Sequence, residues 1–213
     1  MMSSNLEKRR GLMLVISSPS GAGKTTLARK LMAEFDTVAL SISATTRTPR
    51  PNEVEGQDYY FKTHDRFHDL VKQGAFLEWA KVFDHYYGSL KSETEAKLSA
   101  GFDVIFDVDW QGADALHDQV PNDCVSVFIL PPSIEALASR LDQRPGSTPE
   151  MVARRMADAK AEISHWRRYD YCIINDDLGM AYSQLRNILL VERMKRLRQN
   201  NLAPHVRALL GED

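Results

Sequence analysis

The run from Ser18 to Thr25, with the sequence SPSGAGKT, carries the strongest chemical signal in the chain. It follows an apolar run and opens a helical pattern, which is the context in which such a glycine-rich loop binds phosphates. Gly21 and Gly23 let backbone N–H groups surround phosphate oxygens, and Lys24 adds a full positive charge. The pattern predicts a site for a nucleoside triphosphate, with the Thr25 hydroxyl as a ligand for Mg²⁺. A turn without a ligand is the alternative, and Ser18 replaces the usual first glycine.

A second group of side chains suits another phosphate. Arg47 and Arg50 flank a proline in the sequence TTRTPR, and paired guanidinium groups bind a phosphate with several oxygens. The sequences DYYF and YYGS add phenolic hydroxyl groups, from Tyr59 and Tyr60 and from Tyr86 and Tyr87. The alternatives are a surface loop for the two arginines and an ordinary turn for Tyr87 and Ser89.

Glu78 is a carboxylate framed by large apolar residues in the sequence FLEW. Guanine presents N1–H and N2–H₂ side by side, and one carboxylate can accept both. Adenine presents an acceptor at N1, so a site built on Glu78 would reject it. A strand residue on a solvated face is the alternative for Glu78, and Trp79 and Trp110 are expected to be packing residues.

Composition limits the other classes of function. The chain has 213 residues, which suits one domain, and its 27 basic and 29 acidic residues give a net charge of −2. This balance argues against bulk nucleic-acid binding, and the basic run 193–198 suits the end of a helix. Cys124 and Cys172 lie in apolar runs, so we expect two buried free thiols in a reducing compartment. With no long apolar stretch and no signal peptide, we expect no membrane contact and a cytoplasmic location.

Short apolar runs alternate with helical patterns along most of the chain. The expected strands are 12–17, 102–108, 125–130 and 171–174, and the main expected helices are 26–35, 134–141, 149–166 and 179–199. This order predicts an α/β fold with a mostly parallel central sheet. The phosphate loop then lies at the carboxyl end of a central strand, where such folds bind ligands.

The stretch 41–89 is different, because it is polar with scattered aromatic residues. We expect an inserted subdomain of short antiparallel strands, near 59–62 and 75–83, with one helix near 65–72. The single domain would then consist of a core (11–40, 90–142 and 150–200), this insert, a lid at 143–149, and weakly ordered tails at 1–10 and 201–213.

From the phosphate loop to Asp177, the chain resembles the guanylate kinases. The motifs TTRTPR, YYGS and DVDWQG carry the resemblance, and they occur in order. The resemblance implies a P-loop three-layer fold with a small GMP-binding insert and a lid. It also implies Mg²⁺-dependent phosphoryl transfer from ATP to GMP, and to dGMP, which yields ADP and GDP for GTP and dGTP supply and recycles GMP.

The resemblance also implies a role for individual residues. The expected ATP-binding set is Ser18, Pro19, Ser20, Gly21, Ala22, Gly23, Lys24, Thr25, Thr26 and Asn175, and the expected GMP-binding set is Ser43, Arg47, Arg50, Tyr59, Glu78, Tyr87, Ser89 and Asp109. Charge stabilisation would fall to Lys24, Arg47, Arg140, Arg144 and Arg155, and the metal ligands would be Thr25 and Asp107. Solvated helix charge is the alternative for the three lid arginines, and a turn or helix cap is the alternative for Asn175.

Two other functions stay open at this level. A non-catalytic guanylate-kinase-like module would bind protein ligands through the same cleft, although such modules typically lose the lysine that is Lys24 here. A related kinase acting on a sugar phosphate would not need Glu78, Ser89 and the arginine pair together. The expected partners are ATP and GMP, without nucleic acid or membrane, and a homo-oligomer stays open.

Overall fold

A computed structural model describes residues 9–82, 84–143 and 146–212. Its central sheet has the strand order β2 (Val38–Leu40), β7 (Asp103–Asp107), β1 (Met13–Ser17), β8 (Cys124–Leu130) and β9 (Tyr171–Ile174). Every pair in this sheet is parallel. All five residues of β1 are buried, as expected of a strand covered on both faces. The predicted parallel α/β core is confirmed.

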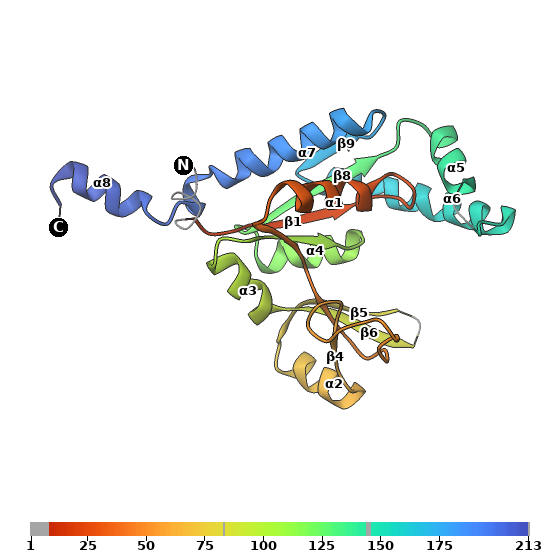
Figure 1. Ribbon diagram of the computed structural model, residues 1–213, viewed down its shortest axis with the longest axis horizontal. Coiled ribbons are helices and arrows are strands. Elements are labelled where there is room, and N and C mark those ends of the chain that lie inside the picture. The colour runs from red at the N-terminus through yellow and green to blue at the C-terminus, as the bar shows by residue number, and fades with distance from the viewer. Residues whose placement is uncertain (1–8, 83, 144–145, 213) are drawn as a thin grey trace.

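Helices cover the two faces of this sheet, which makes three layers (Figure 1). Side chains of β1 alternate between the faces: Leu14 and Ile16 pack with α1 (Lys24–Glu34) and α7 (Leu178–Arg193). Met13 and Val15 pack on the opposite face with α3 (Lys91–Ser99) and α4 (Trp110–Gln119). This alternation of period two gives the sheet an apolar layer on each side.

A pair of helices lies beyond the edge of the sheet where β8 and β9 end. These are α5 (Ile134–Asp142) and α6 (Pro149–Ser164), which pack through Leu137, Leu141 and Ala159. Thr148 caps α6, and Pro149 occupies its first turn, where proline is tolerated because no N–H is needed there. The loop that joins the two helices is the predicted lid, and its residues 144 and 145 lie outside the described residues.

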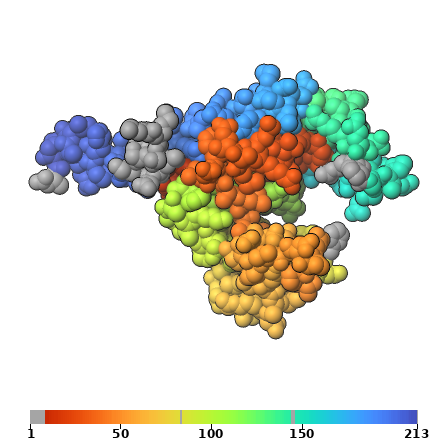
Figure 2. Space-filling model, in the orientation of Figure 1, coloured from red at the N-terminus to blue at the C-terminus, as the bar shows by residue number. Residues whose placement is uncertain are grey.

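The insert forms a lobe of its own beside the core (Figure 2). Its sheet has the order β4 (Tyr60–Phe61), β3 (Ser43–Thr45), β6 (His85–Leu90) and β5 (Phe76–Val82), covered by α2 (His64–Lys72). A small core holds it together, in which the rings of Phe67 and Phe76 stack 4.5 Å apart. The expectation of antiparallel strands was wrong for one pair, since β3 and β4 run parallel.

The two ends of the chain differ from each other. Arg9 and Arg10, which we assigned to a weakly ordered tail, make ion pairs with Asp103 and Asp123 of the core. At the other end, the predicted helix 179–199 stops at Arg193 and is followed by a 3-10 turn, Arg196–Arg198. Beyond it, α8 (Leu202–Leu210) buries none of its residues and points away from the core (Figure 1).

Two expectations drawn from composition meet different outcomes. Cys124 is a buried free thiol, as expected, whereas Cys172 is exposed, so the second half of that expectation was wrong. The reason is that Cys172 lies on β9, the last strand of the sheet, which has no further strand beside it. No helix among the described residues has the length and apolar character that crossing a membrane requires.

Candidate active site

The phosphate loop joins the end of β1 to the start of α1. Gly21 and Gly23 have φ values of 94° and 104°, in the left-handed region that favours glycine. A Cβ atom at Gly23 would also collide with the side-chain amide of Asn175. No side chain caps the first turn of α1 within the described structure, and that turn holds no acidic residue. The start of α1 therefore keeps N–H groups and a positive dipole for an anion.

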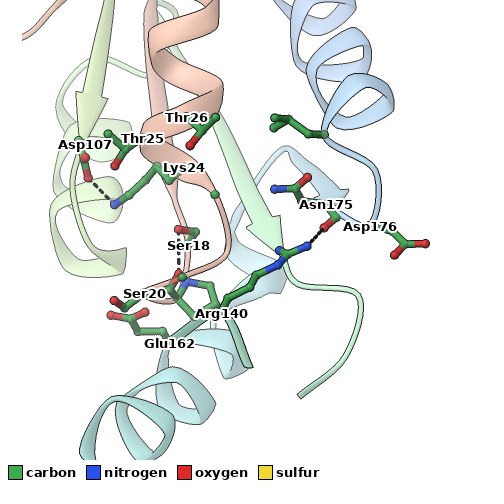
Figure 3. A pocket seen from close by; sticks show the side chains of 14 residues that line it. Ser18, Ser20, Lys24, Thr25, Thr26, Asp107, Arg140, Glu162, Asn175 and Asp176 are labelled. Atoms are coloured by element: carbon green, nitrogen blue, oxygen red, sulfur yellow. Dashed lines mark hydrogen bonds and ion pairs between the residues drawn. The ribbon is translucent and has the colours of Figure 1, made fainter. Parts of the chain in front are cut away.

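This loop lines a cleft of about 640 Å³ (Figure 3). Eight predicted ATP-binding residues of the loop and helix line it: Ser18, Pro19, Ser20, Gly21, Gly23, Lys24, Thr25 and Thr26. Asp107, Arg140 and Asn175 line it as well, from three other segments of the chain. The predicted residue Ala22 does not line the cleft, because its side chain is fully buried in the core.

Lys24 and Asp107 form an ion pair inside this cleft (Figure 3). They meet because β1 and β7 are neighbouring parallel strands, so that the last residue of β7 and the loop that follows β1 lie at one edge of the sheet. Asp107 is 47% exposed and Lys24 is 20% exposed, so both remain accessible to a ligand. The pair puts a positive and a negative group within reach of the same phosphates.

The residues near Lys24 suit Mg²⁺ in the presence of a nucleotide. Thr25 and Asp107 both line the cleft and offer a hydroxyl and a carboxylate oxygen. The described residues contain no group of three or more His, Cys, Asp or Glu side chains that could hold a metal ion alone. Mg²⁺ usually binds through one or two protein oxygens, together with substrate phosphates and water. The donor set therefore fits this ion, with the nucleotide as a further ligand.

Asn175 connects the phosphate loop to a predicted lid arginine. Its side-chain Nδ2 donates to the Ala22 backbone carbonyl at 2.7 Å, and its backbone carbonyl accepts from Arg140 Nη2 at 3.0 Å. The residue is buried, and its backbone N–H donates to Leu130 O. These contacts give Asn175 a structural part in holding the loop, beside its predicted place near the adenine.

A second cavity, of about 260 Å³, opens between the core and the insert. Ser43, Tyr59 and Ser89 of the predicted GMP set line it, and so does Asp107. Ser43 on β3 pairs with Ser89 on β6, which places both hydroxyl groups on one part of the insert's sheet. Because Asp107 lines both cavities, they meet at this carboxylate.

Glu78 and Ser89 face each other across β5 and β6. Ser89 Oγ donates to Glu78 Oε1 at 2.6 Å. Burial raises the pKa of the Glu78 carboxyl, the hydrogen bonds from Ser89 partly oppose this, and the nearby negative charge of Asp109 adds to it. Asp109 itself caps α4 by accepting from the Gly112 N–H at 2.9 Å. The insert and the core thus each supply a carboxylate to the same region.

The two arginines of the predicted GMP site have different surroundings. Arg47 pairs with Glu53 at 2.7 Å, and its guanidinium lies 5.3 Å from the centre of the Tyr59 ring. Tyr59 in turn meets Tyr87 edge to face, with ring centres 6.1 Å apart. Arg50 has an exposed side chain, although its backbone N–H donates to Glu53. Arg47 is therefore fixed in place, while Arg50 extends into solvent.

The three predicted lid arginines are not all placed together. Arg140 lines the cleft of the phosphate loop. Arg155 is half-buried on α6 and does not line that cleft, and Arg144 lies outside the described residues.

Sequence patterns did not identify three carboxylates of the site. Asp176 and Glu162 line the main cleft, and Glu53 holds Arg47. Glu162 Oε2 is buried and has no hydrogen-bond partner within the described structure, and burial raises the pKa of this carboxyl. One signal could have found it, because Glu162 stands seven residues after Arg155 and so shares its helix face. Glu53 gave no such signal.

Comparison with known proteins agrees with this geometry. The family described as guanylate kinase matches residues 10–192. A guanylate kinase of Hyphomonas neptunium is 73% identical over 96% of this chain and 94% of its own length. One of Maricaulis maris is 51% identical over 96% of this chain and 94% of its own length.

A solved structure extends the likeness to the fold. The crystal structure of guanylate kinase from Anaplasma phagocytophilum has a TM-score of 0.72 and 35% identity, with 97% of this chain and 98% of that chain covered. Sequence and architecture therefore agree over nearly the whole length, and the chain belongs to the guanylate kinase family, the ATP:GMP phosphotransferases.

Proposed function

We propose that this chain transfers the γ-phosphoryl group of ATP directly to a phosphate oxygen of GMP or dGMP. The new bond joins that oxygen to the γ-phosphorus, the bond to the bridging oxygen of ADP breaks, and the products are ADP and GDP or dGDP. The observation that carries the proposal is the meeting of two cavities at Asp107, beside Lys24. The phosphate loop lines one cavity, and Ser43, Tyr59 and Ser89 of the insert line the other. The cellular role would be GTP and dGTP supply.

The phosphate loop would hold ATP. Its N–H groups and the start of α1 would surround the phosphates, and these would draw the Lys24 ammonium away from Asp107. The Thr25 hydroxyl and the Asp107 carboxylate would hold Mg²⁺, which when bound neutralises part of the charge on the phosphates. Asn175 would keep the loop in shape through its hydrogen bond to Ala22 O. The adenine would lie near Asn175.

The insert would hold GMP through both ends of the nucleotide. Arg47 and Arg50 would bind its phosphate together with Tyr59 and Tyr87, as paired cations and hydroxyl donors do. The Glu78 carboxylate would accept from guanine N1–H and N2–H₂. Ser89 supports this role, because its hydrogen bond fixes one oxygen of that carboxylate. The remaining members of the set are Ser43, opposite Ser89, and Asp109 on the core side.

Closure of the lid and the insert would complete the site. The charge of the moving phosphoryl group spreads over its oxygens, so positioning and cations supply most of the catalysis. Lys24, Arg47, Arg140, Arg144 and Arg155 would be those cations. Arg155 does not line the main cleft, so its role requires α6 to approach the nucleotide. Such closure also excludes water, which would otherwise hydrolyse ATP.

A coupled assay of ADP release tests the proposal, with ATP and Mg²⁺ and one acceptor at a time. The acceptors are GMP, dGMP, AMP, UMP and a ribose bisphosphate. Turnover with GMP and dGMP, and discrimination against AMP by about 10⁴ or more, would support it. Turnover with the sugar phosphate alone would overturn it. Absence of turnover with every one of these acceptors would also overturn it.

A further inference from the structure

The segment between Arg47 and Phe61 contains no helix, yet its own acidic side chains fold it. Glu53 Oε2 accepts from the Arg50 N–H at 2.8 Å, and Asp58 Oδ2 accepts from the Val54 N–H at 2.8 Å. Glu55 Oε2 accepts from the Phe61 N–H at 2.7 Å. Three carboxylates thus bond backbone groups of this segment, which fixes its path from Arg47 to the short strand β4.

Glu53 differs from the other two because it also forms an ion pair with Arg47, a residue of the predicted GMP site. Arg47 Nη2 donates to Glu53 Oε1 at 2.7 Å and to Oε2 at 2.9 Å. The two side chains are 14% and 16% exposed, so water competes little for this pair. The pairing raises the pKa of Arg47 and, together with the Arg50 N–H, lowers the pKa of Glu53. Both groups are charged at neutral pH.

Arg47 is also held on its other sides. Its Nη1 donates to the Thr48 carbonyl at 2.8 Å, its guanidinium lies 5.3 Å from the centre of the Tyr59 ring, and the nearby Tyr87 side chain adds to the rise in its pKa. A guanidinium has five N–H donors, so these contacts leave at least one donor for a ligand. The arrangement fixes which edge of Arg47 a ligand meets.

We propose that Glu53 is a positioning residue for the phosphate of the acceptor nucleotide, because it orients Arg47 before that phosphate arrives. This rests on the proposed function, in which Arg47 binds the phosphate of GMP. The opposite possibility is that Glu53 competes with the phosphate for Arg47. The geometry favours positioning, because the carboxylate that holds Arg47 also accepts from the Arg50 N–H. Glu53 cannot leave Arg47 freely without loosening the loop that carries both arginines.

The test compares Glu53→Gln with a matched control, Glu55→Gln. Each change removes one negative charge from the same loop, and each removes a carboxylate oxygen that can accept from a backbone N–H. Only Glu53 contacts Arg47. Steady-state kinetics in both substrates gives KM for GMP, KM for ATP and kcat. Thermal melting of each variant shows whether the fold is retained. Glu53→Asp, which keeps the charge on a shorter side chain, is measured beside them.

For Glu53→Gln we expect KM for GMP to rise about tenfold or more, with KM for ATP within about twofold of the wild type. Glu55→Gln should leave KM for GMP within about twofold, and Glu53→Asp should recover part of the loss. A KM for GMP that falls in Glu53→Gln, or stays unchanged, would overturn the proposal. Equal rises in both Gln variants would also overturn it, because charge alone would then explain the effect.

Two further readouts keep the test decisive. If Glu53→Gln does not fold, Glu53→Asp takes its place: a raised KM for GMP with KM for ATP within about twofold of the wild type supports the proposal, and a wild-type or lowered KM for GMP overturns it. Absence of wild-type turnover with GMP would remove the proposed function itself. If the wild type turns over GMP and Glu53→Gln has the same KM for GMP, only the positioning role is removed.

Discussion

The two ends of strand β7 carry aspartates with opposite environments. Asp103 at its start is fully buried and bonds the guanidinium groups of Arg9 and Arg193 as well as the Leu12 N–H. Asp107 at its end is about half exposed and pairs with Lys24. The first carboxylate has its hydrogen-bonding capacity filled by the protein, so it attaches Arg9 and the end of α7 to the sheet. The second retains capacity, so it can bind a substrate.

The same contrast separates the acids of the two lobes. Glu78 is half-buried at the predicted base site with one side-chain donor, Ser89, and its partial burial raises the pKa of its carboxyl. Asp103 is buried with two cationic partners. A charge that is withdrawn from water costs stability, and ionic or hydrogen-bonding partners offset that cost. The difference marks Glu78 as a group kept for a ligand, and four substitutions test it.

The largest effect on catalysis should come from Lys24→Ala. Removing the ammonium beside the transferred phosphates should lower kcat by about 10³. Because Lys24 is partly exposed and pairs with an exposed acid, the thermal midpoint should hardly move. Steady-state kinetics and melting curves measure the two quantities. A kcat near that of the wild type would remove the phosphate loop from the mechanism.

The largest effect on stability should come from the other end of β7. Asp103→Ala leaves Arg9 and Arg193 as buried cations without their shared partner, and should lower the free energy of unfolding by about 3–5 kcal/mol. Urea denaturation measures this loss. The KM values of the folded fraction should stay near those of the wild type. A loss below about 1 kcal/mol would show that Asp103 does not hold Arg9 and α7 to the sheet.

Glu78→Gln should separate function from stability. The pKa of Glu78 is raised in the folded state, so the folded protein binds this proton more tightly than the unfolded chain does. The free energy of unfolding therefore falls as the pH rises from the ordinary carboxyl range through the raised pKa. At neutral pH we expect the variant to be up to about 1 kcal/mol more stable, and at strongly acidic pH the gain should vanish. Denaturation at several pH values measures it.

The kinetics of the same variant should change in the opposite sense. KM for GMP should rise and discrimination against AMP should relax, because an amide cannot accept both guanine donors. In the wild type, KM for GMP should also rise as pH falls through the raised pKa of Glu78. Unchanged selectivity in Glu78→Gln would mean that another group reads the base.

Ser18→Gly should have the smallest effect. The Ser18 hydroxyl donates to the neighbouring Pro19 carbonyl at 3.1 Å, and glycine is the usual residue at this position of the loop. We expect KM for ATP within about twofold of the wild type. A clear loss of ATP binding would assign a specific role to the Ser18 hydroxyl.

The sequence predicted those parts of the molecule that depend on local pattern. Apolar runs located the buried strands, and the loop from Ser18 to Thr25 located the main cleft, because both signals lie in consecutive residues. Long-range pairs left no such trace. Arg9 meets Asp103 and Asn175 meets Ala22 only after the chain has folded, so sequence reasoning missed both contacts. Cys172 was misplaced because an edge strand reads like a central one.

The central claim is that two anion sites meet at Asp107 and that Glu78 selects the acceptor. A crystal structure with GMP and a non-hydrolysable ATP analogue tests it most directly. We predict that the triphosphate lies on the loop at Lys24, the GMP phosphate beside Arg47 and Arg50, and the guanine edge against Glu78. GMP bound anywhere else in the molecule would contradict it.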